Sequence, residues 1–224
     1  MSFSYKDYIL MYKARGWYLP YKYFFENHLF DIKRGIDTHV SLQKNDFEIL
    51  ENLKHGVHYA CSWESTVKKS SYKALQILID DLKNFAFIDI GCGKGKVSII
   101  WNEIANDQKI ILDIYGIDYS KLLVDIAKKN HLKLFGNEGQ FFCEDITSFN
   151  FKKIKKNKLL IYLYNPFDEI LFKKLLDKLK YFFVCIIYVY PIYEKVLIKY
   201  NYNLAYKYKG KHPNETFSIY IKDH

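Results

Sequence analysis

A glycine-rich segment at residues 87–96 has the residue types and spacing of a ligand-binding turn. It reads Phe-Ile-Asp-Ile-Gly-Cys-Gly-Lys-Gly-Lys and contains Asp89, Gly91, Cys92, Gly93 and Gly95. Glycines between a strand and a helix let a ligand approach the backbone closely, beside the positive end of the helix. Asp89 would repel a pyrophosphate and attract an ammonium or sulfonium group. The segment therefore favours a cationic cofactor.

Two other ligand classes bind at glycine-rich turns, and the sequence disfavours both. The dinucleotide fingerprint GxGxxG would need a glycine at position 96, where the chain has Lys96. A P-loop is excluded because the pattern GxxxxGK followed by Ser or Thr does not occur. Neither a dinucleotide nor a nucleoside triphosphate is the expected ligand.

Polar residues also follow three further apolar segments of the chain. Asp118, Asp145 and Asn165 each stand at or just after the end of a predicted strand. The carboxyl ends of parallel strands meet at one edge of the sheet, which is where open α/β sheets bind ligands. We expect these side chains to gather with Asp89 around one site.

The elements that must position these residues are predicted from the apolar pattern. Strands are predicted over residues 85–90, 110–117, 140–143, 159–164 and 182–190. Amphipathic helices are predicted from Thr66 to near Asn84, from about residue 97, and after the N-caps Ser120 and Asp168. Alternating segments at 202–208 and 216–221 predict an antiparallel hairpin. Apolar strands that alternate with helices predict a parallel α/β sheet.

The chain of 224 residues is long enough for one domain with an appendage. Residues 1–65 are aromatic-rich and weakly periodic, and we expect them to form an N-terminal cap. Residues 66–224 hold the regular pattern and form the expected cofactor-binding domain. The short segment at residues 147–158 is expected to help the cap cover the pocket.

Residues 85–167 resemble the class I S-adenosylmethionine-dependent methyltransferases, with the motif order and spacing of that superfamily. The resemblance implies a Rossmann-like three-layer sandwich with a seven-stranded, mostly parallel sheet and an antiparallel C-terminal hairpin. It implies S-adenosyl-L-methionine as the cofactor. The Leu-Tyr-Asn-Pro-Phe segment at residues 163–167 is similar to a variant found in small bacterial enzymes of this superfamily.

The same resemblance implies roles for the residues at the strand ends. Asp118 would accept hydrogen bonds from both ribose hydroxyls, and Asp145 one from the adenine amino group, with Ile146 packed on the ring. Tyr59, in the segment Gly-Val-His-Tyr, would help to close over the cofactor. The implied cofactor-binding residues are Tyr59, Asp89, Gly91, Cys92, Gly93, Gly95, Asp118, Tyr119, Asp145, Ile146 and Asn165. The implied catalytic residues are Asn165 and Tyr164.

The residues that would bind the methyl acceptor are less clearly marked in the sequence than the cofactor-binding residues. The run Asn165-Pro166-Phe167 resembles a motif of amino-group methyltransferases, in which the aromatic ring stacks on the target, although that motif has two prolines. An oxygen acceptor would also need a general base. The histidines that offer one by type are His55, His58 and His131. The sequence leaves open whether oxygen or nitrogen is methylated.

Three functions are consistent with these motifs. The leading hypothesis is methyl transfer to a small metabolite, phosphorylated or sugar-linked, because the chain has no separate RNA-binding domain. The alternative is methylation of a macromolecule, an RNA base or a protein lysine. The net charge of +9 and the basic run at residues 151–158 favour it, but a bias toward lysine in the composition accounts for both features equally well. A third hypothesis is a non-catalytic S-adenosylmethionine-binding protein.

Cysteine usage and hydropathy point to a reducing, cytoplasmic compartment. The four cysteines form no CxxC pair, and the histidines show no HxxxH or HExxH spacing, so we expect neither a disulfide nor a metal. The longest apolar stretch, at residues 181–190, is shorter than the about 20 residues of a membrane span. Charged residues interrupt every apolar run near the N-terminus, so no signal peptide is expected. The sequence carries no signal for oligomeric state.

Overall fold

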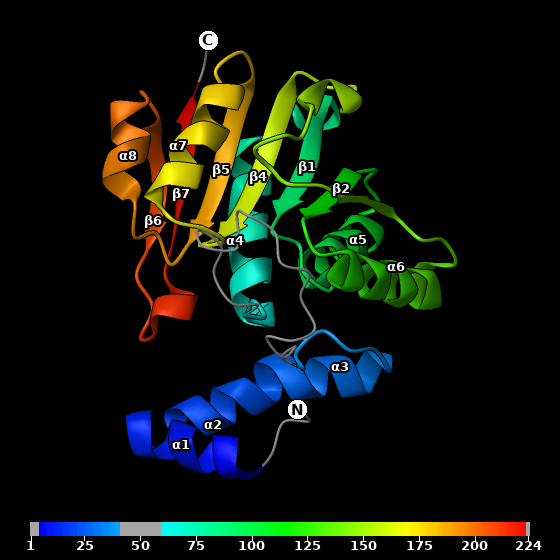
Figure 1. The fold of residues 1–224 in the computed structure, drawn as a ribbon, viewed down its shortest axis with the longest axis vertical. Coiled ribbons are helices and arrows are strands. Elements are labelled where there is room, and N and C mark those ends of the chain that lie inside the picture. The colour runs from blue at the N-terminus through cyan, green and yellow to red at the C-terminus, as the bar shows by residue number, and fades with distance from the viewer. Residues whose placement is uncertain (1–4, 41–59, 223–224) are drawn as a thin grey trace.

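The computed structural model describes residues 5–40 and 60–222 of the chain. Within them, one seven-stranded sheet has the order β3-β2-β1-β4-β5-β7-β6 (Figure 1). Strands β1 to β5 pair in parallel, and β7 runs antiparallel to its neighbours β5 and β6. The strands are β1 (Phe85–Ile90), β2 (Asp113–Asp118), β3 (Gln140–Cys143), β4 (Lys158–Tyr164), β5 (Phe183–Val189), β6 (Asn203–Tyr208) and β7 (Phe217–Lys222). The predicted fold class, including the antiparallel C-terminal hairpin, is confirmed.

Helices cover both faces of the sheet and make three layers (Figure 1). One face packs against α4 (Glu64–Ile77) and α5 (Lys96–Gln108), with α6 (Lys121–Phe135) on the same side. The other face packs against α7 (Glu169–Lys178) and α8 (Glu194–Lys199). Strands β1, β4 and β5 are buried on both faces, which is why their sequences are continuous apolar runs.

Both predicted N-caps are confirmed. The Ser120 side chain accepts a hydrogen bond from the N–H of Leu123 at the start of α6. The Asp168 carboxylate accepts bonds from the N–H groups of Ile170 and Leu171 at the start of α7. Each cap satisfies N–H donors that the first turn of a helix leaves open.

The structure corrects two predicted boundaries and adds one helix. Helix α4 ends at Ile77 rather than near Asn84, since the two aspartates at positions 80 and 81 are unfavourable at the negative end of a helix. Strand β2 begins at Asp113 rather than at residue 110, because Lys109 adopts a left-handed φ of 54° and Ile111 is 95% exposed. Helix α8 was not predicted, since its six residues are too few to show a periodic pattern.

The segment at residues 147–158 does not cover the carboxyl edge of the sheet, contrary to the prediction. Its apolar side chains Phe149, Phe151 and Ile154 are buried in the core between the sheet and α7. At its end, Lys156 donates to the carbonyls of Lys83 and Phe85, where β1 begins. The segment therefore crosses a face of the sheet and ends at the edge opposite the carboxyl ends.

The N-terminal segment lies beyond the carboxyl edge, toward which the parallel strands point (Figure 1). It consists of α1 (Tyr5–Arg15), α2 (Tyr18–Tyr23), a π-helical turn η1 (Phe24–His28) and α3 (Leu29–Arg34). Glu26 of this segment accepts hydrogen bonds from the N–H and hydroxyl of Ser65, at 2.8 Å and 2.6 Å, in the first turn of α4. The predicted boundary at residue 65 remains a prediction.

No helix within residues 5–40 or 60–222 is both long and apolar enough to cross a bilayer. All four cysteines are free thiols.

Candidate functional site

The glycine-rich turn joins the carboxyl end of β1 to the start of α5. The N–H groups of Gly91 and Cys92 both donate to the carbonyl of Ile117 in β2, at 2.8 Å and 3.1 Å. Gly91, Gly93 and Gly95 have φ angles of 77°, 51° and 83°, a region that other residues rarely adopt. The turn is thus fixed against β2, and the N-terminus of α5 opens toward the carboxyl edge.

Close packing also requires two of these glycines. A Cβ at Gly91 would stand 2.8 Å from the Cβ of Pro166 in the loop after β4. A Cβ at Gly95 would stand 3.1 Å from the Cβ of Ala127 in α6. The turn therefore lies in contact with both the loop after β4 and helix α6.

Asp118, at the end of β2, is held by the backbone around it. Its Oδ2 accepts a hydrogen bond from the N–H of Gly93 and its Oδ1 accepts one from the N–H of Ser120, both at 2.9 Å. The residue is 7% exposed. Burial raises the pKa of its carboxyl, although the backbone N–H groups oppose this shift. The neighbouring Tyr119 is half-buried, and burial followed by the charge of Asp118 raises the pKa of its hydroxyl.

Asp89 lies on β1 opposite Gly116 of β2, two residues before Asp118. It is 3% exposed, and among the described residues no hydrogen bond reaches its carboxylate. Burial and, second, the charge of Asp118 raise its carboxyl pKa well above the usual range. The same two causes raise the pKa of the buried Cys92 thiol. Two buried carboxylates that repel each other make this edge attractive to a cation.

The end of β3 adjoins the end of β2. The N–H of Glu144 donates to the carbonyl of Asp118 at 2.9 Å. Asp145 is half-buried, and its Oδ1 accepts bonds from the N–H and the hydroxyl of Thr147, both at 2.7 Å. Ile146 is buried. Asp145 therefore lies at the predicted edge, with one carboxylate oxygen engaged in its own turn.

The end of β4 presents Tyr164 and Asn165. Asn165 has a φ of 43°, and its Oδ1 accepts a long bond of 3.5 Å from the hydroxyl of Tyr188. Burial, followed by the charge of Cys61, raises the pKa of Tyr164, while a hydrogen bond from Asn214 lowers it. Phe167 is buried, with its ring 6.4 Å from that of Phe172, so it belongs to the core rather than to a stacking platform.

The remaining predicted residues divide into two groups. Tyr59, His55 and His58 lie outside the described residues. His131 is buried in α6, where its Nδ1 bonds the carbonyl of Asn137 at 2.8 Å and its Nε2 lies 3.2 Å from the amide of Asn102. His131 therefore has a structural role and is not a base at the site.

Comparison with known proteins decides the family. A family model described as "Methyltransferase domain" matches residues 81–197, more than half of the chain. The chain belongs to this methyltransferase family. The predicted class I S-adenosylmethionine-dependent methyltransferase, and with it the cofactor, is confirmed.

Individual relatives of this methyltransferase are distant. A tRNA N(3)-methylcytidine methyltransferase of Schizosaccharomyces pombe is 25% identical over 128 residues, which are 48% of this chain and 41% of the relative. The match thus spans about two fifths of that curated protein.

Two solved structures share the fold. A magnesium protoporphyrin IX methyltransferase of Synechocystis, solved with bound S-adenosylmethionine, has a TM-score of 0.51 and 18% identity, covering 71% of this chain and 79% of that one. A candidate RNA methyltransferase of Pyrococcus horikoshii has a TM-score of 0.54 and 14% identity, covering 87% of this chain and 94% of that one.

Lys94 and Lys96, in and just after the glycine turn, contact the N-terminal segment, which the sequence did not predict. The Lys94 side chain is 1% exposed, and its Nζ donates to Oδ2 of Asp37 at 2.6 Å and to the carbonyl of Val40 at 2.8 Å. Nζ of Lys96 donates to the carbonyl of Glu26 at 2.5 Å and to Oδ1 of Asn27 at 2.8 Å. The glycine-rich turn of the methyltransferase is thereby bonded directly to the N-terminal segment. No local signal marks such contacts, since they join residues far apart in sequence.

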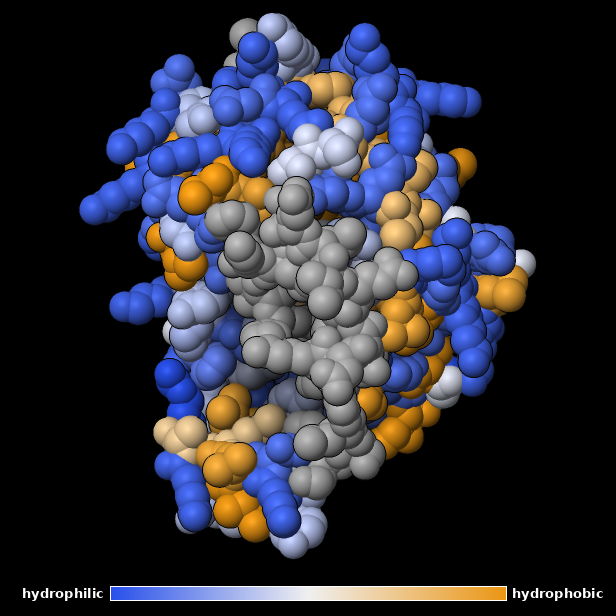
Figure 2. Space-filling view, in the orientation of Figure 1, coloured by the Kyte–Doolittle hydropathy of each residue, from blue (hydrophilic) through white to orange (hydrophobic). Residues whose placement is uncertain are grey.

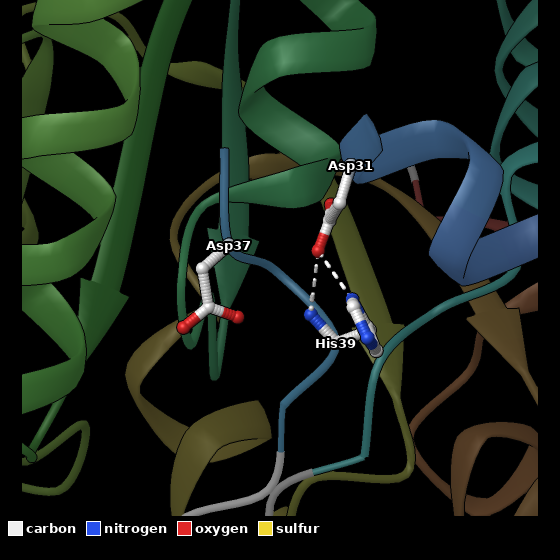
Figure 3. A group of neighbouring side chains, drawn as sticks. All are labelled: Asp31, Asp37 and His39. Atoms are coloured by element: carbon white, nitrogen blue, oxygen red, sulfur yellow. Dashed lines mark hydrogen bonds and ion pairs between the residues drawn. The ribbon is translucent and has the colours of Figure 1, made fainter. Parts of the chain in front are cut away.

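Asp31, Asp37 and His39 form a cluster with the spacing of a metal site. Figure 3 shows Asp31 bonded to His39, with the Asp37 carboxylate nearby but not bonded to either, and the ligand atoms of the three residues lie within 4.8 Å of one another. Oδ2 of Asp31 lies 2.5 Å from Nδ1 of His39, and its Oδ1 accepts from the hydroxyl of Thr38 at 2.6 Å. Burial would raise the pKa of Asp31, but these bonds outweigh it and lower that pKa. Lys94 binds Asp37 and so joins this part of the N-terminal segment to the glycine-rich turn.

Proposed function

We propose that the carboxyl edge of β1, β2 and β3 binds S-adenosylmethionine in one orientation. Asp89 attracts the cationic methionine end, because its buried carboxylate has no cation beside it within the described residues. Asp118 accepts bonds from the ribose hydroxyls, which is supported by the two backbone N–H groups that fix its carboxylate. Asp145 contacts the adenine through its carboxylate, and Ile146 contacts it through its apolar side chain.

Six further residues belong to the proposed cofactor site. Gly91, Gly93 and Gly95 bring the backbone close to the ligand, since their left-handed φ angles shape the turn. Cys92 packs beneath the ligand as a neutral thiol, in keeping with its raised pKa. Tyr119 follows Asp118 and offers its half-buried ring to the adenosine. Tyr59, predicted to close over the cofactor, remains part of the proposal.

The reaction proposed is transfer of the methyl group to an oxygen or nitrogen of a small metabolite, phosphorylated or sugar-linked, beside Asn165 and Tyr164. The bound cofactor supplies an electrophilic methyl group. The chain's own task is to hold the acceptor at about 3–3.5 Å from that group and in line with it. Tyr164 keeps its proton at neutral pH because its pKa is raised, so it donates a hydrogen bond to the acceptor. Asn165 accepts one.

The proposal of a small acceptor is supported by the bonds from Lys94 and Lys96 to the N-terminal segment. They fix residues 26–40 over the glycine turn, so the chain supplies its own cover at the cofactor edge. Arg34 strengthens this cover, since its guanidinium bonds Glu103 in α5 at 2.6 Å and 2.8 Å. We infer that residues 5–40 belong to a cap under which a small acceptor binds.

Transfer of a labelled methyl group tests this proposal. The enzyme is incubated with methyl-labelled S-adenosylmethionine and either dialysable metabolites or RNA from the same cell extract. The proposal expects label in the dialysable fraction, and expects Asn165→Ala to lower kcat by about 100-fold with a smaller effect on cofactor affinity. Label in RNA alone would support the second candidate below. Cofactor binding without transfer to either fraction would indicate a non-catalytic binding protein.

Methylation of an RNA base is the second candidate, and a specific surface favours it. The N-terminal helices expose three aromatic side chains, Tyr5 at 71%, Tyr12 at 46% and Trp17 at 76%. The basic residues Lys6, Lys13 and Arg15 of the same segment are also exposed. Figure 2 shows apolar side chains at the surface of this end of the molecule, beside hydrophilic ones. Exposed rings with interspersed cations suit single-stranded RNA, and the fission yeast relative acts on tRNA.

The basic run at residues 151–158 does not support the RNA candidate. Lys156 and Lys158 are engaged at the amino ends of β1 and β4, where Lys158 binds Asp81 at 2.5 Å. That edge lies opposite the proposed site. A better test is Trp17→Ala combined with Lys13→Glu. The RNA candidate expects this variant to lose RNA affinity and part of the salt dependence of binding, whereas a small-molecule enzyme would be unaffected.

A further inference from the structure

Tyr162 carries a buried hydroxyl without a partner near the proposed cofactor site. The residue lies in β4 and is 0% exposed, and its phenol oxygen has no hydrogen-bond partner among the described residues. A buried hydroxyl left unpaired is destabilising, and a ligand that pairs it removes that cost. The hydroxyl of Tyr162 is therefore available to a ligand that reaches it.

The sheet register places Tyr162 beside Asp89. The two residues are paired across β4 and β1, so both side chains point to the face of the sheet covered by α4 and α5. The Tyr162 ring packs edge-on against Trp101 of α5, at 6.2 Å, and the indole N–H of Trp101 is already bonded to Ser71 at 2.8 Å. Helix α5 thus confines the ring without satisfying its hydroxyl.

The electrostatic surroundings agree with this placement. Burial raises the pKa of Tyr162, Ser62 lowers it, and the charge of Asp89 raises it further. Ser62 is close enough to the hydroxyl to lower this pKa, but no contact of the phenol oxygen with a described residue meets hydrogen-bond geometry. Tyr162 is thus a neutral hydrogen-bond donor beside an acidic residue at the proposed methionine end of the site.

The amino-acid end of the cofactor presents an ammonium and a carboxylate on the same carbon. Asp89 can attract the ammonium but repels the carboxylate, so the site needs a donor beside it. On the basis of the proposed cofactor orientation, we propose that Tyr162 is a positioning residue whose hydroxyl donates a hydrogen bond to the cofactor carboxylate. Its hydroxyl then gains on binding the partner that it lacks in the free protein.

The chain provides a matched control in Tyr202. This tyrosine is also buried, at 3% exposure, with an unpartnered hydroxyl. It belongs to the core cluster on the opposite face of the sheet and precedes β6. Because β6 runs parallel to β5, Tyr202 lies at the edge opposite the carboxyl ends. Tyr202→Phe removes a similar hydroxyl far from the proposed site.

Calorimetric titration with two ligands tests the proposal. S-adenosylhomocysteine has both the ammonium and the carboxylate, and its decarboxylated analogue has the ammonium alone. The native chain should prefer S-adenosylhomocysteine, and Tyr162→Phe should bind it about 10–100-fold more weakly, as for a lost hydrogen bond to a charged group. Tyr162→Phe should bind the analogue as the native chain does, and Tyr202→Phe should match the native chain with both ligands.

Other outcomes have definite meanings. Tyr162→Phe that keeps full affinity for S-adenosylhomocysteine, or that loses affinity equally for both ligands, would overturn the role of the hydroxyl. Because Phe keeps the ring and removes an unpaired hydroxyl, thermal unfolding of the variant should occur at no lower temperature than in the native chain. If the native chain bound neither ligand, the proposed cofactor orientation itself would fail, and this inference with it.

Discussion

Gly91 and Pro166 lie in direct contact, although they belong to loops after different strands. A Cβ at Gly91 would stand 2.8 Å from the Cβ of Pro166, and Gly91 has a φ of 77°. The first loop belongs to the proposed cofactor site and the second to the proposed acceptor site. The spacing of the two sites thus depends on a position where only glycine fits.

Gly91→Ala is expected to be destabilising for two separable reasons. The left-handed φ alone costs about 1–2 kcal/mol, and the contact with Pro166 adds about 1–3 kcal/mol of overpacking. Gly136→Ala is the matched control, since Gly136 has a φ of 74° with nothing within 4 Å of its Cβ position. Chemical denaturation of both variants measures the difference. Equal losses of unfolding free energy in Gly91→Ala and Gly136→Ala would show that the contact with Pro166 adds nothing to the cost.

The N-terminal segment should be held less firmly when Lys96 is replaced by Met. Lys96 is 3% exposed, and its loss leaves the carbonyl of Glu26 and the side-chain oxygen of Asn27 without their donor. The expected cost is about 1–3 kcal/mol. Limited proteolysis should then cleave within residues 5–40 faster than in the native chain. Lys121→Met, at a 69% exposed side chain, serves as the control and should leave the cleavage rate unchanged.

Cofactor affinity should rise with pH in the range below the free-protein pKa of Asp89. The pKa of Asp89 is raised well above its usual range in the free protein by burial and by Asp118. A bound cation favours the ionised carboxylate, so the pKa is lower in the complex and binding releases a proton. Affinity therefore increases as the pH rises toward the free-protein pKa, and levels off above it. Titration calorimetry in buffers with different ionisation enthalpies measures this release.

Asp89→Asn separates this effect from the other titrating groups. The variant cannot ionise at position 89, so it should lose most of the pH dependence while Asp118 retains its own. An unchanged slope in Asp89→Asn, or an affinity that falls as the pH rises, would remove Asp89 from the methionine end of the site.

Much of the fold was predictable because local chemistry and global topology agree. The strands β1, β4 and β5 are apolar runs because helices bury both of their faces. Ser120 and Asp168 marked two helix starts because capping is a local interaction. The boundary at Asp113 and the short helix α8 were missed because a left-handed Lys109 and a six-residue helix leave no periodic signal.

The candidate site was predictable only in part, for the same reason. Asp118 could be placed because it ends a strand, and strand ends converge on one edge. The partners of Lys94 and Lys96 could not, since they lie 54 to 70 residues away in the sequence and meet only in the folded chain. Phe167 occupies the position at which the similar motif has a stacking ring, but it is buried by α7, a packing outcome that its motif does not encode.

The most direct test of the proposed cofactor site is calorimetric titration of S-adenosylhomocysteine into the native chain and Asp118→Ala. Asp118 is the proposed ribose ligand and also bonds the N–H of Gly93. Asp125→Ala, at a 52% exposed side chain of α6, is the control. We predict one site per chain, an affinity that Asp118→Ala weakens by about 1.5–3 kcal/mol, and no change in Asp125→Ala. Native affinity in Asp118→Ala would contradict the proposed placement of the cofactor.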